Sequence, residues 1–436
     1  MLNNRARRDA TYLFVEKVGQ LLAVAVVNVV LLRELGPSIY GYLGAATSIL
    51  AIAMPLSTLG HVPVVRSLSS AQKRSGVSRG IVSFGVRLTI LGCVLGATVM
   101  LTVALLAPAG ETRNLIAILS FSFLARPFWG FDAWYKARSL NHRAAVIRLS
   151  GILISGIGRL IIAVTTESLW ALAVFVVLEH AITGILFAID YRRTREPFKK
   201  VRANHTIRKD IIRSSVPMFF SSLAVMLYMR ADQPMLLYMT DSAQVGLYSA
   251  AANLSDSLAF IPTIVSTLFM PAAFKLYEIS HDRFFARMRF VLGLISGIGY
   301  IIVICGWFAS PFVIALLYGE AYNPSAELLQ ILLFSVPFVF VGVIQGIWVA
   351  AARLHRFQLI FACLAAFINI GLNFYLIPIF GATGAACSTV LAHATASCLG
   401  NFLFKETRPI AKTQLRALDP FYATQCVYRQ ARNLRR

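Results

Sequence analysis

The chain is organised as a series of long apolar stretches separated by short polar ones. Each stretch runs for roughly 20 to 28 residues, which is enough for an α-helix to cross a hydrocarbon layer of about 30 Å. The pattern predicts an all-α polytopic membrane protein with twelve transmembrane helices. The predicted spans are 12–32, 39–60, 81–107, 114–135, 144–165, 168–190, 211–239, 245–274, 290–317, 325–352, 354–378 and 381–404.

Composition supports a membrane protein and excludes a soluble one. Hydrophobic residues make up 58% of the chain and charged residues 14%, so the apolar surface exceeds what a soluble core can bury. The formal net charge of +22 would suggest nucleic acid as the partner of a soluble chain, but the distribution of the charges gives no reason to expect nucleic acid here. The first stretch contains Glu16 and Lys17 and lacks a small-residue cleavage pattern, so we expect no cleaved signal peptide.

Basic residues alternate from one connection to the next. Most of the 41 Lys and Arg residues lie in every second connection, whereas the opposite connections contain only Arg33 and Arg113. Positive charge marks the cytoplasmic side, so twelve spans with both termini in the cytoplasm are predicted. Contact of these basic segments with anionic lipid of the inner leaflet explains their charge, which makes membrane lipids expected partners.

The connections on the opposite side are all short, so no domain can fold outside the membrane there. This counts against a polymerase, ligase or glycosyltransferase embedded in the membrane. The sequence has no metal-binding His/Cys spacing, no phosphate-binding glycine loop and no nucleophile motif. We therefore expect a transporter rather than an enzyme, with no catalytic residue and no bound metal. All cysteines except Cys426 lie in predicted spans, where free thiols are expected.

The longest internal polar connection divides the chain into halves of six spans each. A faint repeat relates residues 40–46 to residues 245–251, each at the start of the second span of its half. Both halves then begin with the same orientation, so a symmetry axis along the membrane normal is predicted. The predicted parts are a six-helix lobe 1–190, a basic cytoplasmic linker 191–210, a six-helix lobe 211–404 and a basic cytoplasmic tail 405–436.

Charged residues inside the spans are the candidate functional residues, because each unpaired charge there costs at least about 2.5 to 3.5 kcal/mol. Basic and acidic residues occur in equal number within the spans, so either mutual ion pairs or a shared polar cavity can explain them. Those far from the membrane edges are Arg126, Arg159, Glu179, Arg230, Asp232 and Asp256. For polar stripes such as Asn369, Asn373 and Thr389, hydrogen bonding between helices is the expected role.

Three aromatic residues lie toward the cytoplasmic end of the fourth stretch, namely Trp129, Trp134 and Tyr135. Such rings can stack on sugar faces. Their position near the interface instead favours an aromatic belt at the membrane surface.

Several short runs, in this order and spacing, resemble the polysaccharide transporter (oligosaccharide flippase) family. The runs are Leu35-Gly-Pro-Ser-Ile-Tyr-Gly41, Arg230-Ala-Asp232, Gly246-Leu-Tyr-Ser-Ala-Ala, the prolines Pro262 and Pro271, and Ile377-Pro-Ile-Phe-Gly381-Ala-Thr-Gly384-Ala-Ala. That family belongs to the MOP superfamily, together with MATE drug exporters and lipid II flippases. The resemblance covers almost the whole chain except the basic tail.

The resemblance implies a MATE-like fold that moves a polyprenyl-pyrophosphate-linked oligosaccharide from the cytoplasmic to the periplasmic leaflet of a bacterial inner membrane. The oligosaccharide would serve lipopolysaccharide O-antigen, exopolysaccharide or capsule synthesis. A polysaccharide polymerase and a chain-length regulator are possible partners. The two lobes are expected to open alternately around an Arg-containing cavity, with no cofactor but with H⁺ or Na⁺ as a possible coupling ion.

Arginine suits such a substrate because its planar fork meets phosphate oxygens in pairs and stays charged. The residues expected to bind the pyrophosphate or the sugar are Arg126, Arg159 and Arg230, with Lys17 and Arg87 as first contacts from the cytoplasm. The residues expected to orient these arginines, to bind sugar hydroxyls or to couple transport to an ion are Asp232, Asp256 and Glu179.

Three other functions are considered. A MATE-type exporter of cationic drugs would need a cavity dominated by carboxylates. A membrane enzyme of polysaccharide assembly is disfavoured by the short external connections. A lipid II flippase of the same superfamily typically has two further helices, which the charge pattern does not accommodate.

Overall fold

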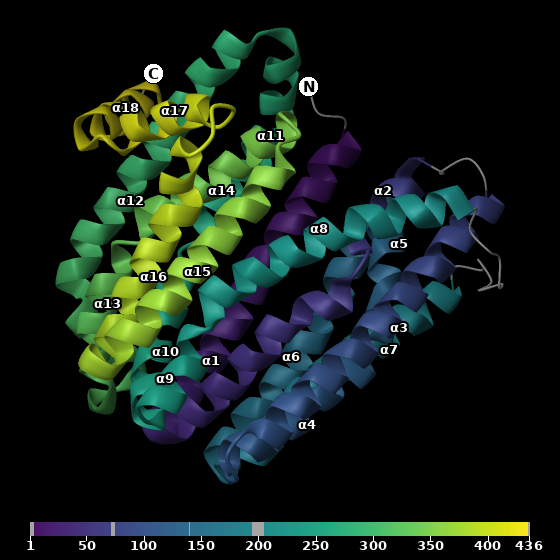
Figure 1. Ribbon diagram of the computed structural model, residues 1–436, viewed down its shortest axis with the longest axis vertical. Coiled ribbons are helices and arrows are strands. Elements are labelled where there is room, and N and C mark those ends of the chain that lie inside the picture. The colour runs from purple at the N-terminus through teal and green to yellow at the C-terminus, as the bar shows by residue number, and fades with distance from the viewer. Residues whose placement is uncertain (1–3, 71–74, 139, 194–204, 435–436) are drawn as a thin grey trace. The chain divides into compact units, whose positions relative to one another are not determined.

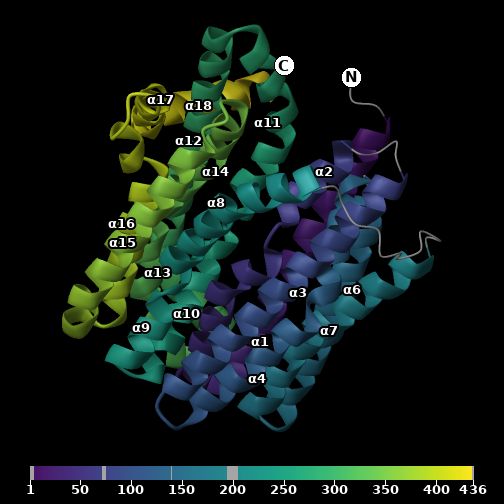
Figure 2. The ribbon, with the colours of Figure 1, turned by 45° about the vertical axis from the view of Figure 1, so that its right-hand side comes forward.

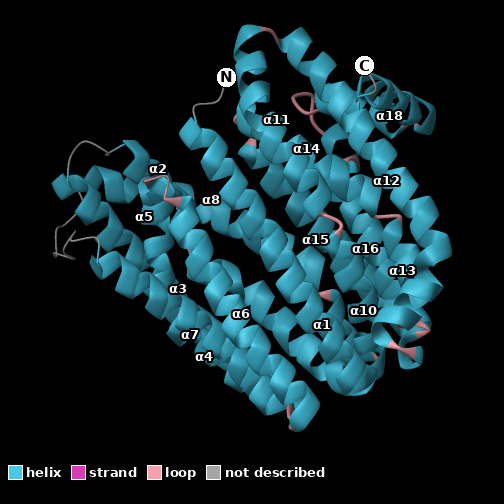
Figure 3. Ribbon diagram, turned by 180° about the vertical axis from the view of Figure 1, so that it is seen from behind, coloured by secondary structure: helices cyan, strands magenta, loops and turns pink. Residues whose placement is uncertain are grey.

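The computed structural model describes residues 4–70, 75–138, 140–193 and 205–434. These residues form α-helices, short 3-10 helices and turns, without a β-strand among them (Figure 3). Packing divides the chain into two units, unit 1 from Met1 to Met226 and unit 2 from Leu227 to Arg436. The all-α prediction is confirmed.

Unit 1 is built around a layer of long helices, in which α6 packs against α1 and α7, and α4 packs against α3 and α7 (Figure 1). Its elements are α1 (Asn4–Ala53), η1 (Met54–Thr58), α2 (His61–Ser70), α3 (Ser75–Leu106), α4 (Glu111–Ala125), η2 (Pro127–Phe131), α5 (Asp132–Ala137), α6 (Asn141–Thr165), α7 (Leu169–Arg193) and the first part of α8 (His205–Arg230). One core cluster joins α2, α3, α5 and α7 and includes Ile81, Trp134, Tyr135 and Phe187.

The aromatic belt predicted for Trp134 and Tyr135 is wrong. Their side chains are 5% and 0% exposed, and Tyr135 donates a hydrogen bond to Asp190 over 2.7 Å. The break after α4 at Pro127 redirects the chain into η2 and α5, and this bend of 41° turns both rings into the core. Local sequence position gave no sign of this change in direction.

Unit 2 consists of the end of α8 and all later elements. They are α9 (Asp232–Met239), α10 (Ser242–Ser257), α11 (Phe260–Ile279), α12 (His281–Tyr318), η3 (Glu320–Tyr322), α13 (Ser325–Leu333), α14 (Val336–Ala351), α15 (His355–Phe380), α16 (Ala382–Ser397), η4 (Leu399–Phe402), α17 (Arg408–Leu418) and α18 (Pro420–Leu434). Helices α15 and α16 lie side by side (Figure 2), joined by the tight turn at Gly381, whose positive φ of 56° suits a residue without a Cβ.

The described helices include eight that are long and apolar enough to cross a membrane, or up to ten if each of two bent pairs counts as one span. This is consistent with twelve predicted spans. The first of the eight contains two predicted spans, since Gly36 (φ 70°) interrupts α1 just before Pro37. The last predicted span begins with α16, whose 16 residues are fewer than the roughly 20 that a straight crossing needs.

Helix α8 belongs to both units, because the division after Met226 falls within it. Ser215 of α8 packs near Gly60 in unit 1, whereas Tyr228 makes an edge contact with the ring of His393 in unit 2. The sequence instead suggests a boundary at the linker 191–210, of which residues 194–204 lie outside the described part of the chain.

The basic tail contains two helices, α17 and α18, which pack against α12 (Figures 1 and 2). Gln414 of α17 is 1% exposed and donates hydrogen bonds to Gln345 Oε1 and to the carbonyl oxygen of Ser397, while its own side-chain oxygen accepts one from Asn401. Tyr300 of α12 donates to the carbonyl oxygen of Leu418 over 2.6 Å. The tail is therefore a packed part of unit 2.

Replacing Gln414 with alanine is expected to lower the free energy of unfolding of unit 2 by about 1 to 3 kcal/mol, because the side chains of Gln345 and Asn401 lose a buried hydrogen-bond partner. Thermal unfolding of the purified protein measures the effect. The exposed neighbour Lys412 provides the control, since Lys412→Ala should leave the unfolding temperature unchanged. An unchanged temperature for Gln414→Ala would contradict a structural role for this amide network.

Candidate functional site

Unit 1 brings together two of the predicted arginines with one carboxylate. Arg159 of α6 donates from Nη2 to Oε2 of Glu179 on α7 over 2.7 Å. The two side chains are 14% and 21% exposed. Glu179 also interacts electrostatically with Arg126, which lies at the carboxyl end of α4. One carboxylate thus faces two guanidinium groups, and the group carries a net positive charge.

Arg126 is the member of this group without a paired carboxylate among the described residues. Its Nη1 contacts the sulfur of Met54, and its guanidinium lies 4.5 Å from the centre of the Trp129 ring. Nε of Arg126 is buried and has no hydrogen-bond partner in the described chain, and the same holds for Nε of Arg159. Unpaired donors of this kind are suited to an anionic ligand.

His180 lies beside these arginines. Its backbone carbonyl accepts a hydrogen bond from Nε1 of Trp129 over 3.1 Å, and the two rings meet edge to face at 5.9 Å. Electrostatic interactions link His180 to Arg126 and Arg159. Its Nδ1 is buried without a partner among the described residues, so the imidazole adds a further polar group to the same cluster.

In unit 2, Arg230 forms an ion pair with Asp256. Nη2 of Arg230, at the end of α8, lies 3.1 Å from Oδ2 of Asp256 near the end of α10. The side chains are 28% and 35% exposed. Asp256 and Glu179 thus each contact an arginine, and their role in orienting it for a substrate stays a prediction. Mutual pairing accounts for these two arginines without a ligand, whereas Arg126 needs another explanation.

Asp232 lies in a different environment and contacts none of the predicted arginines. It is 0% exposed, and Oδ2 accepts hydrogen bonds of 2.6 Å from both Tyr248 of α10 and Thr389 of α16. Asn373 of α15 donates to Oδ1. Neutral donors from three helices therefore surround a carboxylate that makes no ion pair with Lys or Arg in the described chain, although His393 is near enough to interact with it electrostatically.

One of the two asparagines beside Asp232 has an unused polar atom. Oδ1 of Asn373 is buried without a hydrogen-bond partner within the described residues, while Asn373 Nδ2 also lies 3.2 Å from Asn369 Oδ1. Oxygen atoms of a carboxylate, an amide and a hydroxyl are ligands that hard cations prefer. A buried carboxylate without a charged partner is costly to keep ionised, so this group can take up a proton or a small cation.

The two predicted first contacts are exposed. Lys17 lies in α1, and Arg87 lies in α3 on the face that also exposes Ile90, Leu91 and Val94. Neither side chain forms an ion pair or hydrogen bond with another described residue. Their assignment to the substrate stays a prediction.

A second charged cluster in unit 1 was not expected from the sequence. Asp132, whose side chain is 8% exposed, lies 2.7 Å from Lys136 Nζ and 3.4 Å from His61 Nε2, and Arg148 donates to its other oxygen. These residues come from α2, α5 and α6, which the cluster ties together. The spacing of Asp132 and Lys136 on one helical turn is the signal that could have suggested part of it.

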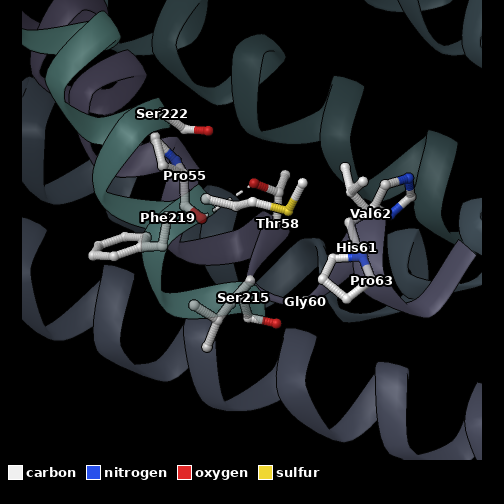
Figure 4. A pocket seen from close by; sticks show the side chains of 11 residues that line it. Pro55, Thr58, Gly60, His61, Val62, Pro63, Ser215, Phe219 and Ser222 are labelled. Carbon is white, nitrogen blue, oxygen red and sulfur yellow. Dashed lines mark hydrogen bonds between the residues drawn. The ribbon is translucent and has the colours of Figure 1, made fainter. Parts of the chain in front are cut away.

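A cavity of about 110 Å³ lies within unit 1, beside this cluster (Figure 4). Elements η1 and α2 form one wall and α8 the other, and His61 is shared between the cavity and the cluster. The lining residues are Pro55, Thr58, Leu59, Gly60, His61, Val62, Pro63, Ser215, Met218, Phe219 and Ser222. The lining contains none of the predicted site residues, and most of it is apolar.

The fold is that of MOP superfamily transporters, and the apolar helices make this a multi-pass membrane protein. An inward-facing multidrug resistance MATE family transporter of that superfamily superposes with a TM-score of 0.76 over 91% of this chain and 96% of its own, at 14% identity. The lipid II flippase MurJ in an inward closed conformation gives a TM-score of 0.68 over 93% and 90% of the two chains, also at 14% identity. The predicted MATE-like fold is confirmed.

The chain belongs to the family described as polysaccharide biosynthesis protein, whose model matches residues 6–277. It is 24% identical over 212 residues to the capsular polysaccharide biosynthesis protein CapF of Staphylococcus aureus. That match covers 47% of this chain and 53% of CapF, so it spans about half the length of the relative. The predicted family resemblance is confirmed.

Proposed function

We propose that this protein is a flippase that moves a polyprenyl-pyrophosphate-linked oligosaccharide from the cytoplasmic to the periplasmic leaflet of a bacterial inner membrane. Membership of a polysaccharide biosynthesis family supports this role, as does a fold shared with a lipid II flippase. O-antigen, exopolysaccharide or capsule synthesis would use the product. A polymerase and a chain-length regulator are the partners that the proposal implies, and both termini would lie in the cytoplasm.

The observation that carries the proposal is the positive cluster of Arg126, Arg159 and Glu179 inside unit 1. A diphosphate can cross a membrane only where donors replace its water, and a guanidinium supplies two parallel donors to one phosphate. In this proposal Arg126 binds the diphosphate directly, because its charge is not neutralised by an ion pair. Glu179 holds Arg159 in place. Within unit 2, Arg230 is paired with Asp256 and keeps its proposed role as a substrate ligand.

Transport also requires a source of energy, and Asp232 is the residue we assign to it. The carboxylate, Thr389, Tyr248 and Asn373 provide oxygen atoms in a fully buried setting. Binding of H⁺ or Na⁺ would neutralise a charge that is otherwise costly to bury. Release of the ion would restore the charge, so the two states of Asp232 can drive alternate opening of the two units.

The main alternative, a MATE-type exporter of cationic drugs, fits the charges less well. An organic cation needs an unpaired carboxylate that it can reach. Glu179 and Asp256 are each paired with an arginine, and Asp232 is 0% exposed. An enzyme of polysaccharide assembly is disfavoured by the short connections predicted on the side opposite the basic ones.

A translocation assay tests the proposal. The purified protein is placed in liposomes that contain a fluorescent polyprenyl-pyrophosphate oligosaccharide, and the label that reaches the opposite leaflet is measured with a membrane-impermeant quencher. Protein-dependent movement is expected for the lipid-linked oligosaccharide and not for a fluorescent cationic drug. Movement of the drug without movement of the oligosaccharide would support the MATE-type function instead.

Exchanging the charges of Arg159 and Glu179 separates pairing from substrate binding. Each single reversal, Arg159→Glu or Glu179→Arg, is expected to lower stability by about 1.5 to 3 kcal/mol, because a charged hydrogen bond is lost and like charges meet. The double exchange should recover most of the thermal stability and leave translocation impaired. If the double exchange recovers both thermal stability and translocation, the Arg159–Glu179 pair has a structural role only. Arg126 would then be the remaining phosphate ligand in unit 1.

A further inference from the structure

The hairpin formed by α17 and α18 has one buried face and one exposed face. On the buried face, Gln414 is held by side chains of α14 and η4, and a Cβ added at Gly293 of α12 would lie 2.8 Å from the Tyr422 ring and 2.9 Å from Cys426. These contacts fix the hairpin against α12. The direction of its exposed face is therefore fixed as well.

The exposed face combines cations with large apolar side chains. Arg408, Lys412 and Arg416 follow one another on the exposed side of α17, which places them near one face of the helix. Leu415 of α17 is 57% exposed, and Phe421 and Tyr428 of α18 are 80% and 70% exposed. Such a mixture is typical of a helix that lies in a membrane interface, with rings in the headgroup layer and cations on phosphate.

Negative charge at this hairpin is limited to two carboxylates, Glu406 and Asp419. Glu406, just before α17, lies 3.4 Å from Arg356, and Asp419 between the two helices accepts a hydrogen bond from the backbone N–H of Phe421. Lys412 and Arg416 have no ion pair or hydrogen bond with another described residue. The exposed face of the hairpin is therefore positively charged and available to an anionic surface.

The hairpin lies at the edge of the apolar surface of unit 2. Tyr300, which donates to Leu418, is followed on α12 by the exposed apolar residues Ile301, Ile304 and Phe308, at 49%, 61% and 80% exposure. Leu399 and Leu403, where the chain leaves its last predicted span, are also exposed, and Lys405 follows directly. The end of the lipid-facing surface thus coincides with the start of the hairpin.

We infer that the α17–α18 hairpin is a binding surface for anionic phospholipid headgroups of the cytoplasmic leaflet. The cations of α17 contact the phosphates, while Leu415, Phe421 and Tyr428 enter the boundary between headgroups and acyl chains. Charge complementarity and position together select this occupant: the surface is basic, and it begins where the hydrocarbon-facing surface ends. The inference is independent of the transported substrate.

Depth measurement provides the first test. A nitroxide label is attached to Phe421→Cys in full-length protein whose exposed thiols Cys305 and Cys363 are replaced by serine, and the protein is placed in phosphatidylglycerol nanodiscs. Collisions with oxygen, which concentrates in lipid, are compared with collisions with a water-soluble nickel chelate. We expect the label at position 421 to favour oxygen, and a control label at the exposed position Asp282→Cys to favour nickel.

Lipid selectivity provides the second test. Phosphatidylglycerol added to the detergent-solubilised protein is expected to raise the unfolding temperature more than phosphatidylcholine does. The double variant Lys412→Gln/Arg416→Gln should lose at least half of that difference. A charge-matched control, Arg33→Gln/Arg113→Gln, removes two exposed cations from the connections predicted on the opposite side of the membrane and should retain it.

Three outcomes would overturn the inference. A label at position 421 as accessible to nickel as the label at position 282 would place the hairpin in water. A label shielded from both reagents would show that protein, rather than lipid, covers it. Equal loss of lipid selectivity in the hairpin variant and the matched control would show that the selectivity depends on the net charge of the protein and not on the hairpin.

Discussion

Replacing Arg126 with alanine is expected to slow translocation of the lipid-linked oligosaccharide by about tenfold to a hundredfold. The proposed contact is a charge-assisted hydrogen bond to the diphosphate, and bonds to charged groups contribute about 1.5 to 3 kcal/mol. Arg126 has a buried Nε without a described partner and forms no ion pair with a described carboxylate. In the proposal, the ligand supplies the missing partner for a guanidinium at this depth. The rate is measured with the quencher assay in liposomes.

Two further variants make the Arg126 result specific. Arg126→Lys keeps the positive charge but loses the planar fork, so an intermediate rate is expected. Arg113→Ala removes an exposed arginine at the other end of the same helix, α4, and should translocate normally. Equal rates for the wild type, Arg126→Ala and Arg126→Lys would reject the proposed phosphate contact.

Loss of folding must be separated from loss of binding in these variants. The guanidinium of Arg126 packs on Met54 and Trp129, so alanine also removes packing. Thermal unfolding in detergent gives the size of that effect. If Arg126→Lys retains the wild-type unfolding temperature and still translocates slowly, the defect lies in substrate binding.

The sequence predicts the helical architecture well because the membrane imposes a length on each apolar stretch. Breaks within that architecture are also visible where Gly and Pro occur together, as at Gly36 and Pro37. The bend after Arg126 is different, because Pro127 marks its position but not its direction. For this reason Trp134 and Tyr135 are predicted at the membrane surface and are found in the core.

Candidate charges could be identified from their depth in the spans, whereas their partners could not. The pairing of Arg159 with Glu179 depends on the packing of α6 against α7, which sequence separation does not reveal. The same limit applies to Asp232. Its nearness to Arg230 in the sequence suggests an ion pair, but successive positions of a helix point in different directions, and the carboxylate is turned toward Tyr248, Thr389 and Asn373.

The tail shows a similar limit. Its positive charge predicts a cytoplasmic position, but charge alone does not predict the packed helices α17 and α18. The deciding residue is Gln414, a polar side chain that is buried because Gln345, Asn401 and the carbonyl oxygen of Ser397 satisfy its hydrogen bonds. Such complementary polar groups come from distant parts of the chain, and they become apparent only in three dimensions.

Asp232→Asn is expected to abolish the stimulation of translocation by an ion gradient while leaving the protein as stable as the wild type or more stable. The amide has nearly the same size and keeps one oxygen as the acceptor for Tyr248 and Thr389, while it removes a buried charge that has no Lys or Arg partner within the described chain and is costly to keep ionised. The new amide nitrogen faces Nδ2 of Asn373, so the Asn373 amide must turn to present its unpartnered Oδ1 as the acceptor. A residue needed only for folding would not show this combination of lost coupling and retained stability.

The coupling is measured in liposomes with a sodium gradient at constant pH and, separately, with a pH gradient in the absence of sodium. The gradient that accelerates the wild type by the larger factor identifies the ion, and Asp232→Asn should reduce that factor to about one, because no ionisable oxygen remains to exchange the ion.

Thr389→Val removes a hydroxyl that contacts Asp232 and is expected to weaken a sodium response more than a proton response, since a bound metal ion loses a ligand whereas a proton does not. The exposed carboxylate variant Asp282→Asn serves as the matched control and should respond like the wild type. Full gradient stimulation in Asp232→Asn would remove Asp232 from the coupling mechanism and leave the buried carboxylate with a structural role.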